Sequence, residues 1–172
     1  MDFKTLLIIK HPLEAAWAAM RDHLPEIAAL TDDIESVQTR ERTELSPGIL
    51  QVVSDWKAVP QIPKPIASYT KPEWFSWTDT AVWNDATKNC QWTLQPLAFT
   101  EQLEITGSSL MEPALGGQGT RITIQGKLAF QPSAAGQLGK LASLGIEPIL
   151  KQVITNSFNR MSKALSDYLT AA

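Results

Sequence analysis

The chain has 172 residues with a formal net charge of −3, and 44% of its residues are hydrophobic. This length is typical of one domain with a sizeable core, so we expect a single domain over residues 1–172. The acidic balance argues against a nucleic-acid-binding protein, which needs a cationic surface. The longest apolar run is LLII at 6–9, far short of the roughly 20 residues that a membrane-spanning helix requires.

Cysteine and histidine are scarce in this sequence. The single cysteine, Cys90, cannot form an internal disulfide, which favours a reducing compartment. The first residues contain Asp2 and no small-residue cleavage site, and they predict a strand rather than a signal peptide. His11 and His23 have no further histidine at ligand spacing. We therefore expect a cytoplasmic protein without a metal site or a cofactor.

The first part of the chain predicts one strand and two short helices. Residues 3–11 are rich in β-branched and apolar side chains and stop at Pro12, which suits a first helical turn. The helical pattern that follows is broken at Pro25. Residues 26–34 then predict a second short helix.

Six strand-like segments separated by turn residues come next, and a long helix ends the chain. The strands are expected at 34–45, 49–56, 74–83, 90–97, 99–111 and 120–130. The first of them is polar and suits an edge strand. A short turn of helix at 135–144 precedes the amphipathic helix, whose apolar positions recur at helical spacing from Ile146 to Leu169.

This order predicts an α+β fold in which a curved antiparallel sheet of six to seven strands wraps around the C-terminal helix. The same order (β-α-α-β6-α) resembles the START-like (SRPBCC) superfamily, the helix-grip fold also seen in polyketide cyclases and the major birch-pollen allergen. The resemblance covers essentially the whole chain and rests on element order. It implies a domain that binds a lipid or another hydrophobic small molecule.

Residues 58–72 form a proline-rich, oily segment between two strands. Pro60, Pro63 and Pro65 stiffen the segment and disfavour a helix at 61–64. A loop of this length is more often functional than filler. It can be a lid, a tip that touches a membrane transiently, a partner surface, or a surface loop packed on neighbouring strands.

Trp56 at a strand end, the proline-containing loop and the aromatic strand from Trp74 also resemble the PRELI-like lipid-transfer proteins. In that family the corresponding loop is a lid over a phospholipid cavity. Here only Lys57, Lys64 and Lys71 supply positive charge around the loop, fewer basic residues than that family has. The resemblance implies a lid over a cavity for an apolar ligand.

Five of the six tryptophans fall within residues 56–92. In the strand expected at 74–83, alternation places the aromatic side chains on one face. These rings can fill the core of the concave sheet, or they can line a cavity under the C-terminal helix. For a cavity, we expect ligand contacts from Trp56, Ile62, Ile66, Phe75, Trp77, Trp83, Trp92, Ile154 and Phe158.

Three carboxylates are candidates for chemistry: Asp55, Asp79 and Glu101. Alternation turns Asp79 inward with the tryptophans, and Glu101 would share a face with the apolar residues that follow it. A buried acid can orient a ligand or act as a general acid or base. Alternatively, an arginine such as Arg40 or Arg121 pairs with it, or it sits near a strand end.

Three functions remain open on this sequence. A carrier of a hydrophobic ligand, gated by Trp56 and loop 58–72, is favoured over an enzyme. An enzyme of the cyclase or dehydratase kind would use Asp79 or Glu101 in the same cavity. An interaction module would dock a partner through loop 58–72. The fold alone does not choose among them.

Overall fold

The computed structural model describes all residues except 61–62, 69, 99–100, 131–144 and 146, and it leaves undescribed the side chains of 65–66, 130, 147 and 149–150. The first half contains β1 (Asp2–Ile9), α1 (Leu13–Asp22), α2 (Leu24–Ala28), β2 (Ile34–Ser46), β3 (Ile49–Ala58), α3 (Lys64–Ala67) and the 3-10 turn η1 (Pro72–Phe75). The second half contains β4 (Ser76–Asn84), β5 (Asn89–Pro96), β6 (Leu103–Ala114), η2 (Leu115–Gly117), β7 (Gly119–Phe130) and α5 (Glu147–Ala171).

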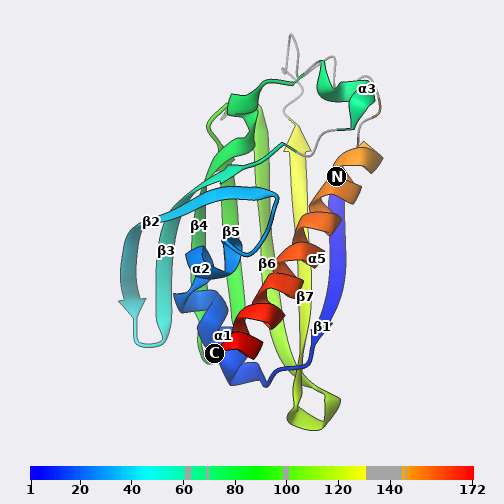
Figure 1. Cartoon of the computed structure of the whole chain (residues 1–172). Helices are drawn as coiled ribbons and strands as arrows, with labels where there is room; N and C mark the ends of the chain where they lie inside the picture. The colour runs from blue at the N-terminus through cyan, green and yellow to red at the C-terminus, as the bar shows by residue number, and fades with distance from the viewer. Residues whose placement is uncertain (61–62, 69, 99–100, 131–144, 146) are drawn as a thin grey trace.

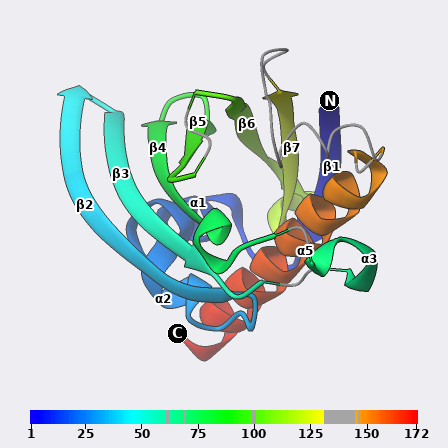
Figure 2. The same cartoon turned by 90° about the horizontal axis from the view of Figure 1, so that it is seen from above.

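The seven strands form one antiparallel sheet in the order β1-β7-β6-β5-β4-β3-β2. Neighbouring strands are successive in sequence except for β1 and β7, whose pairing joins the first strand to the last. The sheet curves around α5, and α1 and α2 lie beside the C-terminal end of that helix (Figures 1 and 2). The predicted α+β helix-grip architecture is confirmed, with seven strands.

The strand β2 forms one edge of the sheet, as its polar sequence predicts. Most of its side chains are exposed, and its pairing with β3 shifts register at three places. Such irregularities bend an edge strand and limit edge-to-edge association. In Figure 2, β2 and β3 curl away from the rest of the sheet and widen its concave side.

The core lies between the concave face of the sheet and the helices α1, α2 and α5. Its largest fully buried side chains are Trp17, Ile27, Leu165 and Thr120. The Trp17 ring meets Trp83 of β4 edge to face, with centroids 5.1 Å apart, an arrangement that aromatic pairs favour.

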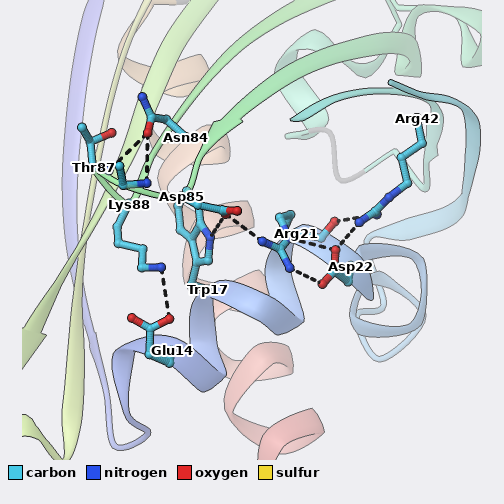
Figure 3. A network of polar contacts seen from close by, with 10 residues as sticks. Glu14, Trp17, Arg21, Asp22, Arg42, Asn84, Asp85, Thr87 and Lys88 are labelled. Carbon is cyan, nitrogen blue, oxygen red and sulfur yellow. Dashed lines mark hydrogen bonds and ion pairs between the residues drawn. The ribbon is translucent and has the colours of Figure 1, made fainter. Parts of the chain in front are cut away.

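A polar network fastens α1 to the turn between β4 and β5 (Figure 3). Asp85 accepts hydrogen bonds of 2.7 Å from the indole N–H of Trp17 and from Arg21. Arg21 also pairs with Asp22, which in turn binds Arg42 of β2. The hydrogen bonds from Arg21 and Arg42 hold the pKa of Asp22 at about 2. The hydrogen bond from Trp17, together with the contact to Arg21, keeps the pKa of Asp85 below its usual range. The network ties α1, the β4–β5 turn and β2 together.

Several predicted boundaries differ from the structure. The helix α2 begins at Leu24, before the proline expected to separate the helices, because proline is tolerated in a first helical turn. The strand β4 begins at Ser76, after η1, and β6 begins at Leu103. The segment 58–72 contains the helical turn α3, which the sequence did not predict. The helix expected at 135–144 lies outside the described residues.

Candidate ligand-binding cavity

A cavity of about 470 Å³ lies between the concave face of the sheet and α5. Its lining is overwhelmingly apolar and comes from the sheet, the helices and the segment after β3. The residues from the sheet include Leu7, Trp56, Trp77, Asp79, Ala81, Trp83, Cys90, Trp92, Leu94, Ile105 and Ile124. Its volume is in the range of small-molecule sites in proteins, roughly 300–1,000 Å³. The interior is therefore not filled by side chains alone.

The strand register explains why the tryptophans gather there. On β4, alternation turns Trp77, Asp79, Ala81 and Trp83 to the same side. Trp77 is directly opposite Trp56 of β3, and the two rings stack with centroids 5.6 Å apart. Two adjacent strands thus present aromatic rings to one concave surface.

Trp92 of β5 occupies the middle of this surface. It is directly opposite Ala81 of β4 and Gly107 of β6, and its indole N–H donates a 3.1 Å hydrogen bond to Ser109. From the facing helix, Phe158 lies 6.3 Å from Trp92 between ring centroids. These contacts define the wall between β5 and α5.

Asp79 places a carboxyl group in the apolar lining of the cavity. Its carboxyl is buried in the lining, and its Oδ1 has no hydrogen-bond partner among the described residues. Burial raises the pKa of Asp79 to about 7, from a usual value of 3.8, because the charged form loses its hydration. A carboxyl of this kind can donate or accept a proton near neutral pH.

Two other polar atoms in the lining also lack a partner among the described residues. One is the indole N–H of Trp56, and the other is Oδ1 of Asp33, which precedes β2. The second oxygen of Asp33 accepts a 3.0 Å hydrogen bond from Ser157 and lies 3.4 Å from Arg160 of α5. Asp33 therefore has a counter-charge, whereas Asp79 has none in the described part of the chain.

The segment after β3 contributes to the same cavity. Val59, Pro63 and Thr70 are among its lining residues, and α3 lies beside the first turns of α5 in both views (Figures 1 and 2). Ile62 lies outside the described residues, and the side chain of Ile66 is not described. Their expected ligand contacts stay predictions.

Seven of the residues expected to contact a ligand line the cavity: Trp56, Phe75, Trp77, Trp83, Trp92, Ile154 and Phe158. Glu101 does not: it is exposed in the turn before β6, so the alternation of that strand does not apply to it. Its candidacy as a cavity acid is wrong. Asp33 and Ser109 were missed. Asp33 precedes β2, where no period marks its direction, whereas Ser109 shares a face of β6 with Ile105 and Met111, so alternation along that strand could have found it.

The arginines proposed as partners of a buried acid lie elsewhere. The Arg40 guanidinium makes a bidentate contact with the Asp55 carboxylate, with N–O distances of 2.6 and 3.0 Å, away from the cavity. Arg121 pairs with Glu112 on the neighbouring strand. Asp55 is thus the paired carboxylate, and Asp79 is left without an arginine.

The described residues contain no group of three or more His, Cys, Asp or Glu side chains that could hold a metal ion. Cys90 is buried, and burial together with the nearby Asp79 carboxyl raises the pKa of its thiol. A thiol in this state is a poor nucleophile. No helix of the described part is long and apolar enough to cross a membrane.

No protein-family model matches the chain, and no curated protein matches its sequence. Solved structures do match it. The protein TTHA0849 from Thermus thermophilus has 15% identity and a TM-score of 0.72, and the match covers 99% of this chain and 98% of that one. The Zhui aromatase/cyclase from Streptomyces sp. R1128 has 15% identity, a TM-score of 0.67 and coverage of 99% and 93%.

Norcoclaurine synthase from Thalictrum flavum is also similar, with 10% identity, a TM-score of 0.64 and coverage of 100% and 87%. At such identities the likeness shows the fold. The chain shares the helix-grip fold of these structures. The nearer resemblance to the PRELI-like proteins is not confirmed by these comparisons.

Proposed function

We propose that this helix-grip chain binds a lipid or another hydrophobic small molecule in the cavity between the sheet and α5. The observation that carries the proposal is the cavity of about 470 Å³ with its almost wholly apolar lining. Moving about 300 Å² of apolar ligand surface out of water supplies roughly 7–8 kcal/mol before the costs of association. The few polar groups would set the orientation of the ligand.

The segment 58–72 would act as the lid. Val59, Pro63 and Thr70 line the cavity although they come from the connection between β3 and β4. The prolines limit the number of open conformations that the segment loses on closing. Transient membrane contact or partner docking through this segment, and a cytoplasmic location, stay predictions.

A titration with the neutral dye N-phenyl-1-naphthylamine tests the binding function. We expect saturable fluorescence enhancement with one dye per chain, reversed by 1-dodecanol. Leu94→Trp places a ring in the cavity and should weaken dye binding at least tenfold. The matched control is Gln95→Trp, which adds the same ring on the exposed side of the strand.

Melting temperatures of both variants establish that they fold, and Ile105→Phe provides a second, smaller obstruction in the same lining. Equal affinity for the dye in wild type, Leu94→Trp and Ile105→Phe would contradict binding in this cavity. Absence of saturable binding to the wild type would contradict the function itself.

An enzyme on the same scaffold is the second candidate, and Asp79 is the observation that favours it. A carboxyl with a pKa of about 7 is suited to general acid-base catalysis at neutral pH. One of the similar structures is an aromatase/cyclase. The ligand that co-purifies with the chain can be identified by native mass spectrometry and then incubated with wild type and with Asp79→Asn. Conversion by the wild type alone supports an enzyme, and an unchanged ligand in both contradicts one.

A further inference from the structure

We propose that the ligand of this cavity is an amphiphile with a protonated amine, and that the amine binds between the Asp79 carboxylate and the tryptophans beside it. This inference rests on the proposed binding function and names the chemical class of the ligand. It follows from the charges in the lining and from the positions of three indole rings.

The ionisable groups in the described lining are all acidic. Its ionisable side chains in the described part are Asp33, Asp79 and Cys90, and it includes no lysine, arginine or histidine there. Arg160 approaches Asp33, but no described cation approaches Asp79. A carboxylate or phosphate group on a ligand would meet like charge and no counter-ion, whereas a cation would supply the missing partner.

The aromatic rings lie around Asp79 in the sheet register. Trp77 is two residues before it on the same face of β4. Trp56 is opposite Trp77, and Trp92 is opposite Ala81, so both are diagonal neighbours of Asp79. Diagonal neighbours on one face are about 7–8 Å apart, which long aromatic side chains span. Asp79 is thus bordered by an indole on its own strand and by one on each neighbouring strand.

A carboxylate among indole rings is suited to an ammonium group. The faces of tryptophan rings attract cations, and the attraction is stronger where the contact is desolvated. The carboxylate adds a charge-assisted hydrogen bond, which is stronger than a neutral one. The apolar remainder of the cavity, extending to Phe158 and Leu128, would hold the hydrocarbon part of the ligand.

In the described part of the chain, no side chain beside Asp79 supplies a positive charge to its carboxylate. The residues directly opposite it are Ser54 of β3 and Leu94 of β5. From α5, the polar lining residues are Ser157 and Ser162. Burial without a counter-charge raises the pKa of Asp79, so the arrival of an ammonium group should ionise the carboxyl and release its proton.

Three probes with the same twelve-carbon chain test the proposal by isothermal titration calorimetry: dodecylamine, 1-dodecanol and dodecanoate. Below the micelle concentrations of the amine and the carboxylate, and below the solubility limit of the alcohol, we expect dodecylamine to bind the wild type at least tenfold more tightly than 1-dodecanol, and dodecanoate to bind most weakly. At pH 6, where Asp79 is mostly protonated, binding of dodecylamine should release close to one proton, measured from the buffer dependence of the heat.

Asp79→Asn should bind the amine and the alcohol within twofold of each other and release no proton. Glu101→Gln deletes the same charge from an exposed position and should behave as the wild type. Equal affinities for amine and alcohol in the wild type, or an amine preference that survives in Asp79→Asn, would overturn the amine proposal. Proton release by the wild type tests it independently of any variant.

The outcomes of this experiment distinguish the binding function from the class of the ligand. If 1-dodecanol binds in the cavity without an amine preference, the binding function stands and the ligand class is wrong. If none of the three probes binds the wild type, both are wrong.

Discussion

The indole of Trp92 occupies the space that a side chain at Gly107 would need. A Cβ at Gly107 would lie 2.4 Å from Cη2 of Trp92 and 2.4 Å from the carbonyl oxygen of Gln125. Gly107 is paired with Gly126, where a Cβ would lie 2.5 Å from Cζ of Phe3. The two glycines let the ring lie close to the sheet at the centre of the cavity wall.

Gly107→Ala should therefore destabilise the fold by about 1–3 kcal/mol, as overpacking of a tight site does. It should also displace Trp92 and alter its fluorescence. Chemical denaturation and emission spectra measure both effects. Ser108→Ala, one residue along, is the control, and an equally small effect of both substitutions would contradict the close packing at Gly107.

The pH dependence of stability should reveal Asp79. Its pKa is about 7 in the folded chain, against a usual value of 3.8, so between those values the folded state keeps a proton that the unfolded state has lost. Stability therefore falls as pH rises from 4 to 7, by about 4 kcal/mol from this group.

Asp79→Asn should remove that fall and be more stable than the wild type above pH 7, in the absence of ligand. Urea unfolding of both proteins from pH 4 to 8 measures the difference between the two curves. Glu101→Gln should follow the wild-type curve. Parallel curves for wild type and Asp79→Asn would mean that the Asp79 carboxyl is not held in a desolvated site.

The polar network between α1 and the β4–β5 turn should contribute to stability through Asp85 (Figure 3). Asp85→Ala leaves the buried indole N–H of Trp17 without its acceptor and removes the partner of Arg21. We expect a loss of about 1–3 kcal/mol in the free energy of unfolding. Asp85→Asn keeps an acceptor for Trp17 and should recover about half of the loss. Equal losses in both variants would assign the effect to charge alone.

The lid can be tested at Val59, an exposed residue that nevertheless lines the cavity. Val59→Ser should weaken dye binding about three- to tenfold, because the ligand loses apolar contact at the mouth. Leu97→Ser is the control, since Leu97 is exposed and is not among the lining residues. An equal effect of the two substitutions would contradict a lid at Val59.

The strands and the C-terminal helix could be predicted because their apolar residues follow a simple period. Alternation placed Asp79, Trp77 and Trp83 on one face of β4, and the register confirms their common direction. The same reasoning failed at Glu101, because the strand begins two residues later and alternation has no meaning in the preceding turn.

Other parts of the site depend on contacts distant in sequence. Asp33 reaches the cavity by pairing with Ser157 and Arg160, more than a hundred residues away. No local pattern marks such a partner. The helical turn α3 could not be predicted from a rule that prolines disfavour a helix, because Pro65 is the second residue of that turn, where proline is tolerated.

The indole N–H signals of the six tryptophans provide the most direct measurement of the central claim. Five tryptophans line the cavity, and Trp17 does not. In a ¹H–¹⁵N correlation spectrum titrated with 1-dodecanol, we predict that the signals of Trp56, Trp77 and Trp92 shift to saturation at one ligand per chain, while that of Trp17, assigned with Trp17→Phe, shifts least. Signals that all remain in place at saturating ligand, or that shift only at Trp17, would contradict a ligand site between the sheet and α5.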